Sequence, residues 1–248
     1  GTPSGVTLSP EGGAHQSTIT ASVGAELPGL VAVEPAFATE VEWLLCDSLD
    51  QLSQADGEST YLRLSTRPID QTPFGLAVDR FGLEVLRDLV LKGGYRLIDK
   101  PPTGRAGVTL VTTGVMAPEA LGAADELEQD GIDATVLHLT SPDRIYRSWK
   151  AHHSTTLDGT RPELTASHLH RLIPEMERSR PIISVHDAAS HSLAWIGSVF
   201  GTSQIPLGVD RFGESGSVED LHRATGISSA HIVAAARLAI AGKVDAKR

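Results

Sequence analysis

The stretch Val108–Leu139, VTLVTTGVMAPEALGAADELEQDGIDATVLHL, decides the fold of this chain. Residues 108–112 are a short apolar run typical of a buried strand, and residues 134–139 are a second one. Between them, residues 118–129 have helical spacing, with Pro118 near the first turn, where proline is tolerated. A strand, a helix and a strand in this order predict neighbouring parallel strands joined by a crossover helix.

The same alternation continues on both sides of this stretch. Further strands are predicted at residues 31–34, 60–65, 95–98, 181–185 and, at a sheet edge, 205–209. Further helices are predicted at residues 36–52, 83–90, 143–150, 166–173, 188–200, 218–224 and 228–241. Residues 69–81 and 151–162 are polar and are expected to be loops. The pattern predicts an α/β fold with a mostly parallel sheet covered by helices on both faces. The Pro- and Gly-rich segment Lys100–Gly107 is the best candidate for a domain boundary.

The composition, net charge and cysteine count limit the classes of protein to which the chain can belong. The chain has 248 residues, 40% hydrophobic and 21% charged, as in ordinary soluble globular proteins. Its formal net charge of -10 argues against a nucleic-acid surface, which needs clustered Lys and Arg. Cys46 is the single cysteine, so no internal disulfide forms and a cytoplasmic location is expected. We expect no membrane association, since no apolar run approaches about 20 residues, and no secretory leader.

The loop Leu8–Ser17 holds the strongest candidate residues. Gly12 and Gly13 let the backbone adopt φ > 0 or approach a ligand closely. His15 and Gln16 follow this turn directly, and loops on an α/β scaffold are where binding residues concentrate. On residue types alone, an ordinary polar loop that happens to hold a histidine is the favoured interpretation.

Several stretches together resemble the C-terminal part of the thiamine diphosphate enzymes of the transketolase superfamily. Glu11–Gln16 resembles the acid–Gly–small–His–Gln loop of transketolases. The segment Val31–Val41 is similar to a strand and helix of the homodimeric pyruvate dehydrogenase decarboxylating component, and Tyr61–Thr66 and Leu86–Ile98 keep that enzyme's order and spacing. The segment Asp210–Gly216 matches the end of both families. The ordered set covers nearly all of the chain.

The resemblance implies two domains and a set of site residues. Residues 1–102 would be the later part of a pyrimidine-binding domain, and residues 103–248 a transketolase C-terminal-like domain. His15 would be catalytic, bonding the substrate carbonyl or the developing alkoxide and exchanging protons. Glu11 and Gln16 would contact substrate or orient His15. Arg67 lies near the position of an arginine with which transketolases hold a sugar phosphate, but it is displaced by one residue.

The cofactors implied are thiamine diphosphate and Mg²⁺, held mainly outside this chain. No Gly-Asp-Gly motif followed by Asn is present, and the pyrimidine-contacting glutamate would lie upstream of Leu8. We therefore expect a fragment or split subunit that is inactive alone and joins an N-terminal cofactor-binding portion or subunit in a homodimer or heteromer. The first hypothesis is a pyruvate-type 2-oxoacid decarboxylating dehydrogenase that passes an acyl unit to a lipoyl-bearing acyltransferase. Transketolase-type ketol transfer and a non-catalytic dimerisation or docking module are the alternatives.

Other polar clusters are given structural interpretations. His152-His153 and His168-x-His170 lack a Cys or carboxylate pattern, so we expect no metal site there. His186-Asp187 with Ser190-His191 gives no triad geometry by sequence proximity. His186 nevertheless follows a strand, at the usual ligand edge of an α/β sheet, where a structural or interface role is open. The three tryptophans are expected to pack.

Overall fold

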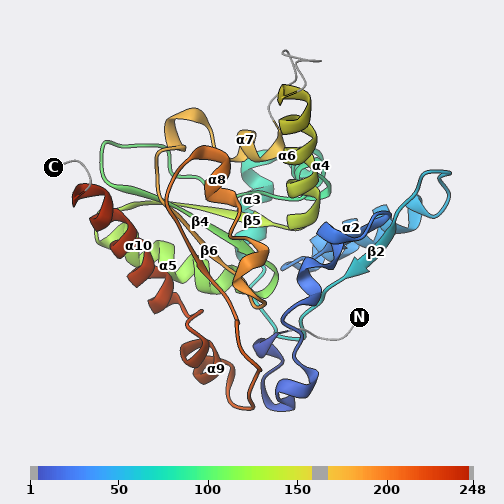
Figure 1. Ribbon diagram of the computed structural model, residues 1–248, viewed down its shortest axis with the longest axis horizontal. Helices are drawn as coiled ribbons and strands as arrows, with labels where there is room; N and C mark the ends of the chain where they lie inside the picture. Colours follow the sequence, from blue (N-terminus) through green and yellow to red (C-terminus); the bar gives the residue numbers. More distant parts are fainter. Residues whose placement is uncertain (1–4, 158–166, 246–248) are drawn as a thin grey trace.

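The computed structural model describes residues 5–157 and 167–245 (Figure 1). Its centre is a five-stranded sheet in the order β3-β5-β4-β6-β7, beside a parallel two-stranded sheet, β1-β2. The strands are β1 (Leu30–Val33), β2 (Ser59–Leu62), β3 (Tyr95–Ile98), β4 (Gly107–Thr113), β5 (Asp133–Leu139), β6 (Ile182–Val185) and β7 (Gln204–Leu207). Only the β3–β5 pair is antiparallel among these strands. The mostly parallel α/β sheet is confirmed.

The helices cover both faces of the larger sheet (Figure 1). They are α1 (Val23–Glu26), α2 (Ala38–Gln51), α3 (Thr72–Phe81), α4 (Leu83–Leu91), α5 (Ala117–Gln129), α6 (Pro142–Leu157), α7 (His168–Leu172), α8 (Ile196–Phe200), α9 (Val218–Thr225) and α10 (Ser229–Asp245). The described residues also form short 3-10 turns, which are η1 (Val6–Glu11), η2 (Gly13–His15), η3 (Thr20–Ser22), η4 (Gly114–Met116), η5 (Glu175–Glu177) and η6 (Ser190–Ser192).

Side chains along each strand alternate between the two faces of the larger sheet, which explains the layer of helices on each face. In β4, Leu110 belongs to the core that contains buried side chains of α5 and α10, while Val111 belongs to the core that contains Ile145 of α6 and Leu169 of α7. Successive strand residues face opposite sides of a sheet, so one apolar run serves both layers. β3 precedes the expected boundary at residue 103 yet supplies the antiparallel edge of this sheet. The boundary itself stays a prediction.

Glu40 joins the smaller sheet's helix to the larger sheet. Its carboxylate accepts the backbone N–H groups of Ala36 at 2.8 Å and Phe37 at 3.0 Å, which caps the start of α2. The same buried group accepts the Tyr95 hydroxyl at 2.8 Å and lies 3.2 Å from His138 Nε2. Burial raises the pKa of Glu40, but His138, the Phe37 N–H and the Tyr95 hydroxyl outweigh it, so the pKa lies below its ordinary value.

Three sequence expectations about elements are wrong. Residues 72–81 form α3 instead of a loop, because Pro73 lies in the first turn, where no helical N–H is lost. Helix α6 continues to Leu157, and the rest of the expected loop, 158–162, lies outside the described residues. Of the helix expected at 188–200, only Ile196–Phe200 is α-helical.

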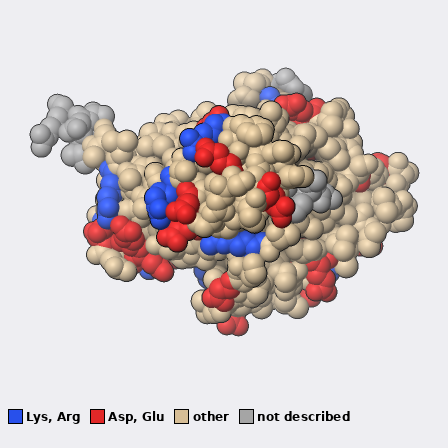
Figure 2. Space-filling model, turned by 90° about the horizontal axis from the view of Figure 1, so that it is seen from below, with Lys and Arg blue, Asp and Glu red and all other residues tan. Residues whose placement is uncertain are grey.

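One apolar stretch, residues 218–242, is long enough to cross a membrane by length and composition alone. Gly226, at φ +77°, ends α9 and separates it from α10, which packs on α5. On the face shown in Figure 2, acidic and basic side chains are interspersed over a largely neutral surface.

Candidate functional site

The N-terminal loop, residues 5–17, packs against the segment Asp210–Gly216 from the other end of the chain. Ser9 Oγ donates to the Gly216 carbonyl at 2.7 Å, and the Gln16 amide donates to the Glu214 carbonyl at 2.9 Å. Gly13 faces the Gly213 carbonyl and the Phe212 ring so closely that a Cβ atom would not fit. Two of the stretches that carried the family resemblance therefore form one surface.

Three of the residues expected in the site lie on this loop, and their side chains differ in exposure. Glu11 and His15 are exposed, and neither side chain has a hydrogen bond or an ion pair within the described part of the chain. Gln16 is buried, and its amide anchors the loop to Glu214. Its Oε1 atom has no hydrogen-bond partner among the described residues. Substrate contact by these three residues stays a prediction.

Arg67 belongs to a different cluster. Its Nη1 lies 3.3 Å from Glu119 Oε1, in the first turn of α5. Glu119 also accepts the Ser229 N–H at 3.1 Å and lies 3.3 Å from His222 Nδ1. The hydrogen bond from His222 is the largest of the effects that lower the pKa of Glu119 to about 2. Arg67 thus links the segment after β2 to α5, and the structure does not bring it to Glu11 or Gln16 by any contact.

Sequence reasoning missed a buried polar network beneath the loop. Glu34 forms an ion pair with Arg63 and accepts a hydrogen bond from His186 Nε2 at 2.8 Å. Burial raises the pKa of Glu34, but Arg63 and His186 outweigh it and lower the pKa to about 2. His186 Nδ1 is 2.7 Å from Ser192 Oγ.

Asp187 connects this buried network to the N-terminal loop. Its carboxylate accepts the backbone N–H groups of Val6 at 2.8 Å and Thr7 at 2.9 Å. Its backbone carbonyl accepts a hydrogen bond from Arg63 Nη2 at 2.7 Å. Burial is the main cause that raises the pKa of Asp187. Thr7 Oγ1 lies 2.9 Å from His222 Nε2, so polar contacts run continuously from Glu34 to Arg67.

One signal could have found this network. Glu34, Arg63 and His186 each follow directly the last residue of a parallel strand, β1, β2 and β6. The carboxyl ends of parallel strands converge at one edge, which is where α/β proteins assemble sites. In the sequence analysis, the structural or interface role left open for His186 was the only indication of this network.

The other histidine clusters form no metal-binding group. Across residues 5–157 and 167–245, no group of three or more His, Cys, Asp or Glu side chains is placed to hold a metal ion. His168 Nε2 contacts the Gly94 carbonyl at 2.8 Å, and the rings of His152 and His170 meet edge-on at 5.2 Å. Asp187 binds backbone N–H groups, and His186 pairs with Glu34 and Ser192, so no hydrolase triad is present there.

Comparison with known proteins gives consistent relatives. Transketolase from the chromosome of Cupriavidus necator is 29% identical over 205 residues, covering 79% of this chain and 25% of its own length. The pyruvate dehydrogenase E1 component of Mycolicibacterium smegmatis is 26% identical over 247 residues, covering 97% of this chain and 25% of its own. The chain therefore spans about a quarter of the length of these relatives.

Solved structures share the fold. A transketolase mutant of Pichia stipitis in complex with fructose 6-phosphate has a TM-score of 0.67 and 20% identity, covering 96% of this chain and 29% of that one. A split gene transketolase, described as an inactive beta4 tetramer, has a TM-score of 0.61 and 19% identity, covering 93% of this chain and 64% of that one.

The family match rests on the larger sheet. The family described as the transketolase-like TK C-terminal domain matches residues 93–228, from just before β3 to the residue before α10. With the ordered resemblance of both chain ends and the fold of the solved transketolases, this match identifies the chain as a member of the transketolase-like TK C-terminal domain family.

Proposed function

We propose that this chain supplies the substrate-facing loop and the C-terminal domain of a thiamine diphosphate-dependent enzyme. The observation that supports this most is the loop itself. His15 is exposed with no partner among the described residues, while Val6, Thr7 and Gln16 beside it are held by buried contacts. An exposed imidazole on an anchored loop suits proton exchange with a bound substrate.

Residues 5–157 and 167–245 do not fit the cofactor's Mg²⁺, because no group of three or more His, Cys, Asp or Glu side chains among them is placed to hold a metal ion. We therefore assign thiamine diphosphate and Mg²⁺ to another portion of the protein or to a second subunit. The residues of this chain would then contact the substrate and not the cofactor. His15 would donate a hydrogen bond to the substrate's carbonyl oxygen and give or take its proton as charge develops there.

Decarboxylation of a 2-oxoacid is the reaction that we favour. The substrate would lose CO2, which leaves a fragment at the oxidation level of an aldehyde. The disulfide of a lipoyl-bearing acyltransferase would oxidise this fragment to an acyl unit by taking up two electrons, so that one lipoyl sulfur carries the acyl unit and the other becomes a thiol. The supporting observation is the ion pair between Arg67 and Glu119, which a sugar phosphate would have to displace before Arg67 could hold it. A 2-oxoacid without a phosphate group does not need Arg67 for binding.

Ketol transfer between sugars is the second candidate. Its support is the 29% identity to the Cupriavidus necator transketolase. In that case Arg67 would exchange Glu119 for the substrate's phosphate, and Arg67→Ala would abolish ketol transfer. We place either enzyme in the cytoplasm, where the exposed thiol of Cys46 stays reduced.

Reconstitution tests these proposals. The chain is mixed with its cofactor-binding portion, and two rates are measured, CO2 release from pyruvate and ketol transfer to an aldose phosphate. CO2 release that survives Arg67→Ala supports the 2-oxoacid enzyme, whereas ketol transfer lost in Arg67→Ala supports the transketolase and refutes the first candidate. A mixture that binds thiamine diphosphate but turns over neither substrate points to the non-catalytic docking module.

A further inference from the structure

The turn between β6 and η6 holds both ends of the N-terminal loop. At the entering end, the Asp187 carboxylate accepts the backbone N–H groups of Val6 at 2.8 Å and Thr7 at 2.9 Å. At the leaving end, the Ala189 N–H donates to the Thr18 carbonyl at 2.8 Å. Three hydrogen bonds to one turn therefore close the base of the loop.

Arg63 joins the same turn to the last residue of the loop. Its Nη2 group donates to the Asp187 carbonyl at 2.7 Å and to the Ser17 carbonyl at 3.1 Å. Its Nη1 group pairs with Glu34, and both side chains are buried. Because one guanidinium contacts the turn, the loop and the residue after β1, the base of the loop is fixed to strand ends of both sheets.

The turn and the first residue of η6 also fix the segment on which the loop lies. The Ser190 N–H donates to the Asp210 carboxylate at 2.8 Å, and the Ala188 carbonyl accepts the Val209 N–H at 2.8 Å. Asp210 begins the segment Asp210–Gly216, whose carbonyl groups accept hydrogen bonds from the loop. The loop and the segment that supports it are therefore positioned from the same place in the fold.

Gly5 shows how closely the loop passes Asp187. Its φ is +76°, and a Cβ atom there would lie 2.2 Å from the Asp187 carbonyl oxygen and 2.3 Å from its Oδ1. Only glycine lets the backbone approach this closely. Asp187 itself is 0% exposed, so it does not touch a substrate. Any effect of Asp187 on the reaction must therefore pass through the loop.

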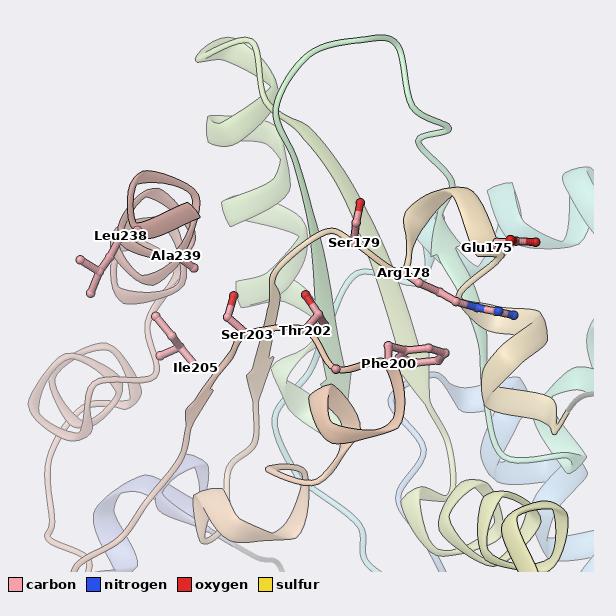
Figure 3. A pocket seen from close by; sticks show the side chains of 11 residues that line it. Glu175, Arg178, Ser179, Phe200, Thr202, Ser203, Ile205, Leu238 and Ala239 are labelled. Carbon is pink, nitrogen blue, oxygen red and sulfur yellow. The ribbon is translucent and has the colours of Figure 1, made fainter. Parts of the chain in front are cut away.

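The hydrogen bonds that close the loop lie at the carboxyl ends of the strands. Figure 3 shows the other end of the larger sheet, where an open hollow wraps around the sheet edge, with Phe200 on one face and Ile205 on the other. Ser179 and Ser203 line this hollow and precede β6 and β7, whereas Asp187 follows β6. The length of the strand separates the two places, so the hollow provides an internal reference for changes made in the turn.

We propose that Asp187 is a positioning residue for His15, and that the turn around it is the fixed base from which the loop presents the imidazole. This inference rests on the proposed function, in which His15 exchanges a proton with the substrate. Proton transfer needs both atoms within hydrogen-bond reach, and a displacement of about 1 Å can lower a rate about 100-fold. The exposed His15 side chain has no hydrogen bond within residues 5–157 and 167–245. Its position is therefore set by the loop backbone, which Asp187 fixes.

Hydrogen exchange of the whole chain, followed by mass spectrometry, tests the fixing of the loop without any measurement of activity. In Asp187→Asn an NH2 group replaces one carboxylate oxygen, so one of the two loop N–H groups loses its acceptor. Residues 5–17 should then exchange about tenfold faster or more, because a buried charge-assisted hydrogen bond is lost. The segments around Ser179 and Ser203 should exchange as in the wild type.

Two further variants sharpen this measurement, with far-UV circular dichroism to show that each is folded. Asp143→Asn is the matched control, because Asp143 is also buried and its carboxylate also accepts a backbone N–H, but its partners are Ala32 and Arg147, outside the loop. Ala189→Pro removes the N–H that donates to the Thr18 carbonyl, and φ -55° at this residue suits proline. Ala189→Pro should speed exchange of the loop, and Asp143→Asn should not.

The second reading uses the chain reconstituted with its cofactor-binding portion. Asp187→Asn should lower kcat about tenfold or more, whereas Asp143→Asn should leave kcat unchanged. In a His15→Ala background, Asp187→Asn should have no further effect on kcat, because a residue that acts through His15 has nothing left to position. A purely structural role would instead lower kcat by the same factor in both backgrounds.

Two results would overturn the positioning role. They are unchanged exchange of the loop in Asp187→Asn, and an equal loss of kcat with and without His15. A His15→Ala enzyme as fast as the wild type would refute the proposed function of His15 and, with it, the catalytic use of this positioning. The exchange result does not depend on that outcome, so the two failures are distinguished.

Discussion

Replacing Arg63 with methionine should strongly destabilise the chain, because it leaves a carboxylate buried without its cation. Arg63 and Glu34 are both buried, and Arg63 also donates to the carbonyls of Asp187 and Ser17. Removing one partner of a buried ion pair costs about 3–5 kcal/mol. For comparison, Arg63 and His186 together lower the pKa of Glu34 from an ordinary 4.5 to about 2 against the effect of burial, which corresponds to roughly 3 kcal/mol at neutral pH.

The pH dependence gives the sharper test. Because the pKa of Glu34 is lowered in the folded state, its contribution is complete above pH 4.5 and is lost as the pH falls towards about 2. The variant should lack this contribution, so the difference in unfolding free energy between the wild type and Arg63→Met should shrink as the pH falls through that range.

Urea unfolding followed by far-UV circular dichroism at pH 7 and pH 3.5 measures this difference. Arg223→Met is the matched control, because Arg223 is 62% exposed and its ion pairs with Glu219 and Asp220 are on the surface. It should cost less than about 1 kcal/mol. An Arg63→Met variant within about 1 kcal/mol of the wild type at pH 7 would refute the reasoning about this network.

Three further predictions concern the loop, the core and α5. Gly13→Ala should undock the loop and speed its cleavage by protease, whereas Gly75→Ala, with open space around it in α3, should raise stability by up to about 1 kcal/mol in thermal unfolding. Glu40→Ala should cost about 3 kcal/mol or more in urea unfolding, because it leaves the Tyr95 hydroxyl and two backbone N–H groups unpaired. In His222→Leu, the pKa of Glu119 should rise from about 2 towards its ordinary 4.5, as followed by NMR of its carboxyl carbon, and an unchanged pKa would contradict the role given to His222.

Local patterns were enough to predict most of the fold. β4, α5 and β5 appear within two residues of the ranges expected from apolar spacing, because each buries its own regular stripe of side chains. Helix α3 lies in a polar, proline-containing stretch that was expected to be a loop, but Pro73 stands in the first turn, where it removes no helical hydrogen bond.

The candidate site was less accessible to sequence reasoning. The loop at Glu11–Gln16 was found by its glycines and by resemblance, and these are local properties. The Glu34–Arg63–Asp187 network depends on three strand ends that are far apart in the sequence and meet only in the folded chain. The pairing of Arg67 with Glu119 likewise joins segments 52 residues apart.

We propose that His15 faces the substrate of a thiamine diphosphate-dependent enzyme, and the variant His15→Ala in the reconstituted protein tests this role. We expect kcat to fall about 100-fold or more, as for loss of a general acid–base group, while binding of thiamine diphosphate and the urea midpoint stay unchanged. His191→Ala, which removes another exposed histidine, is the control. A kcat for His15→Ala equal to that of the wild type would contradict the claim.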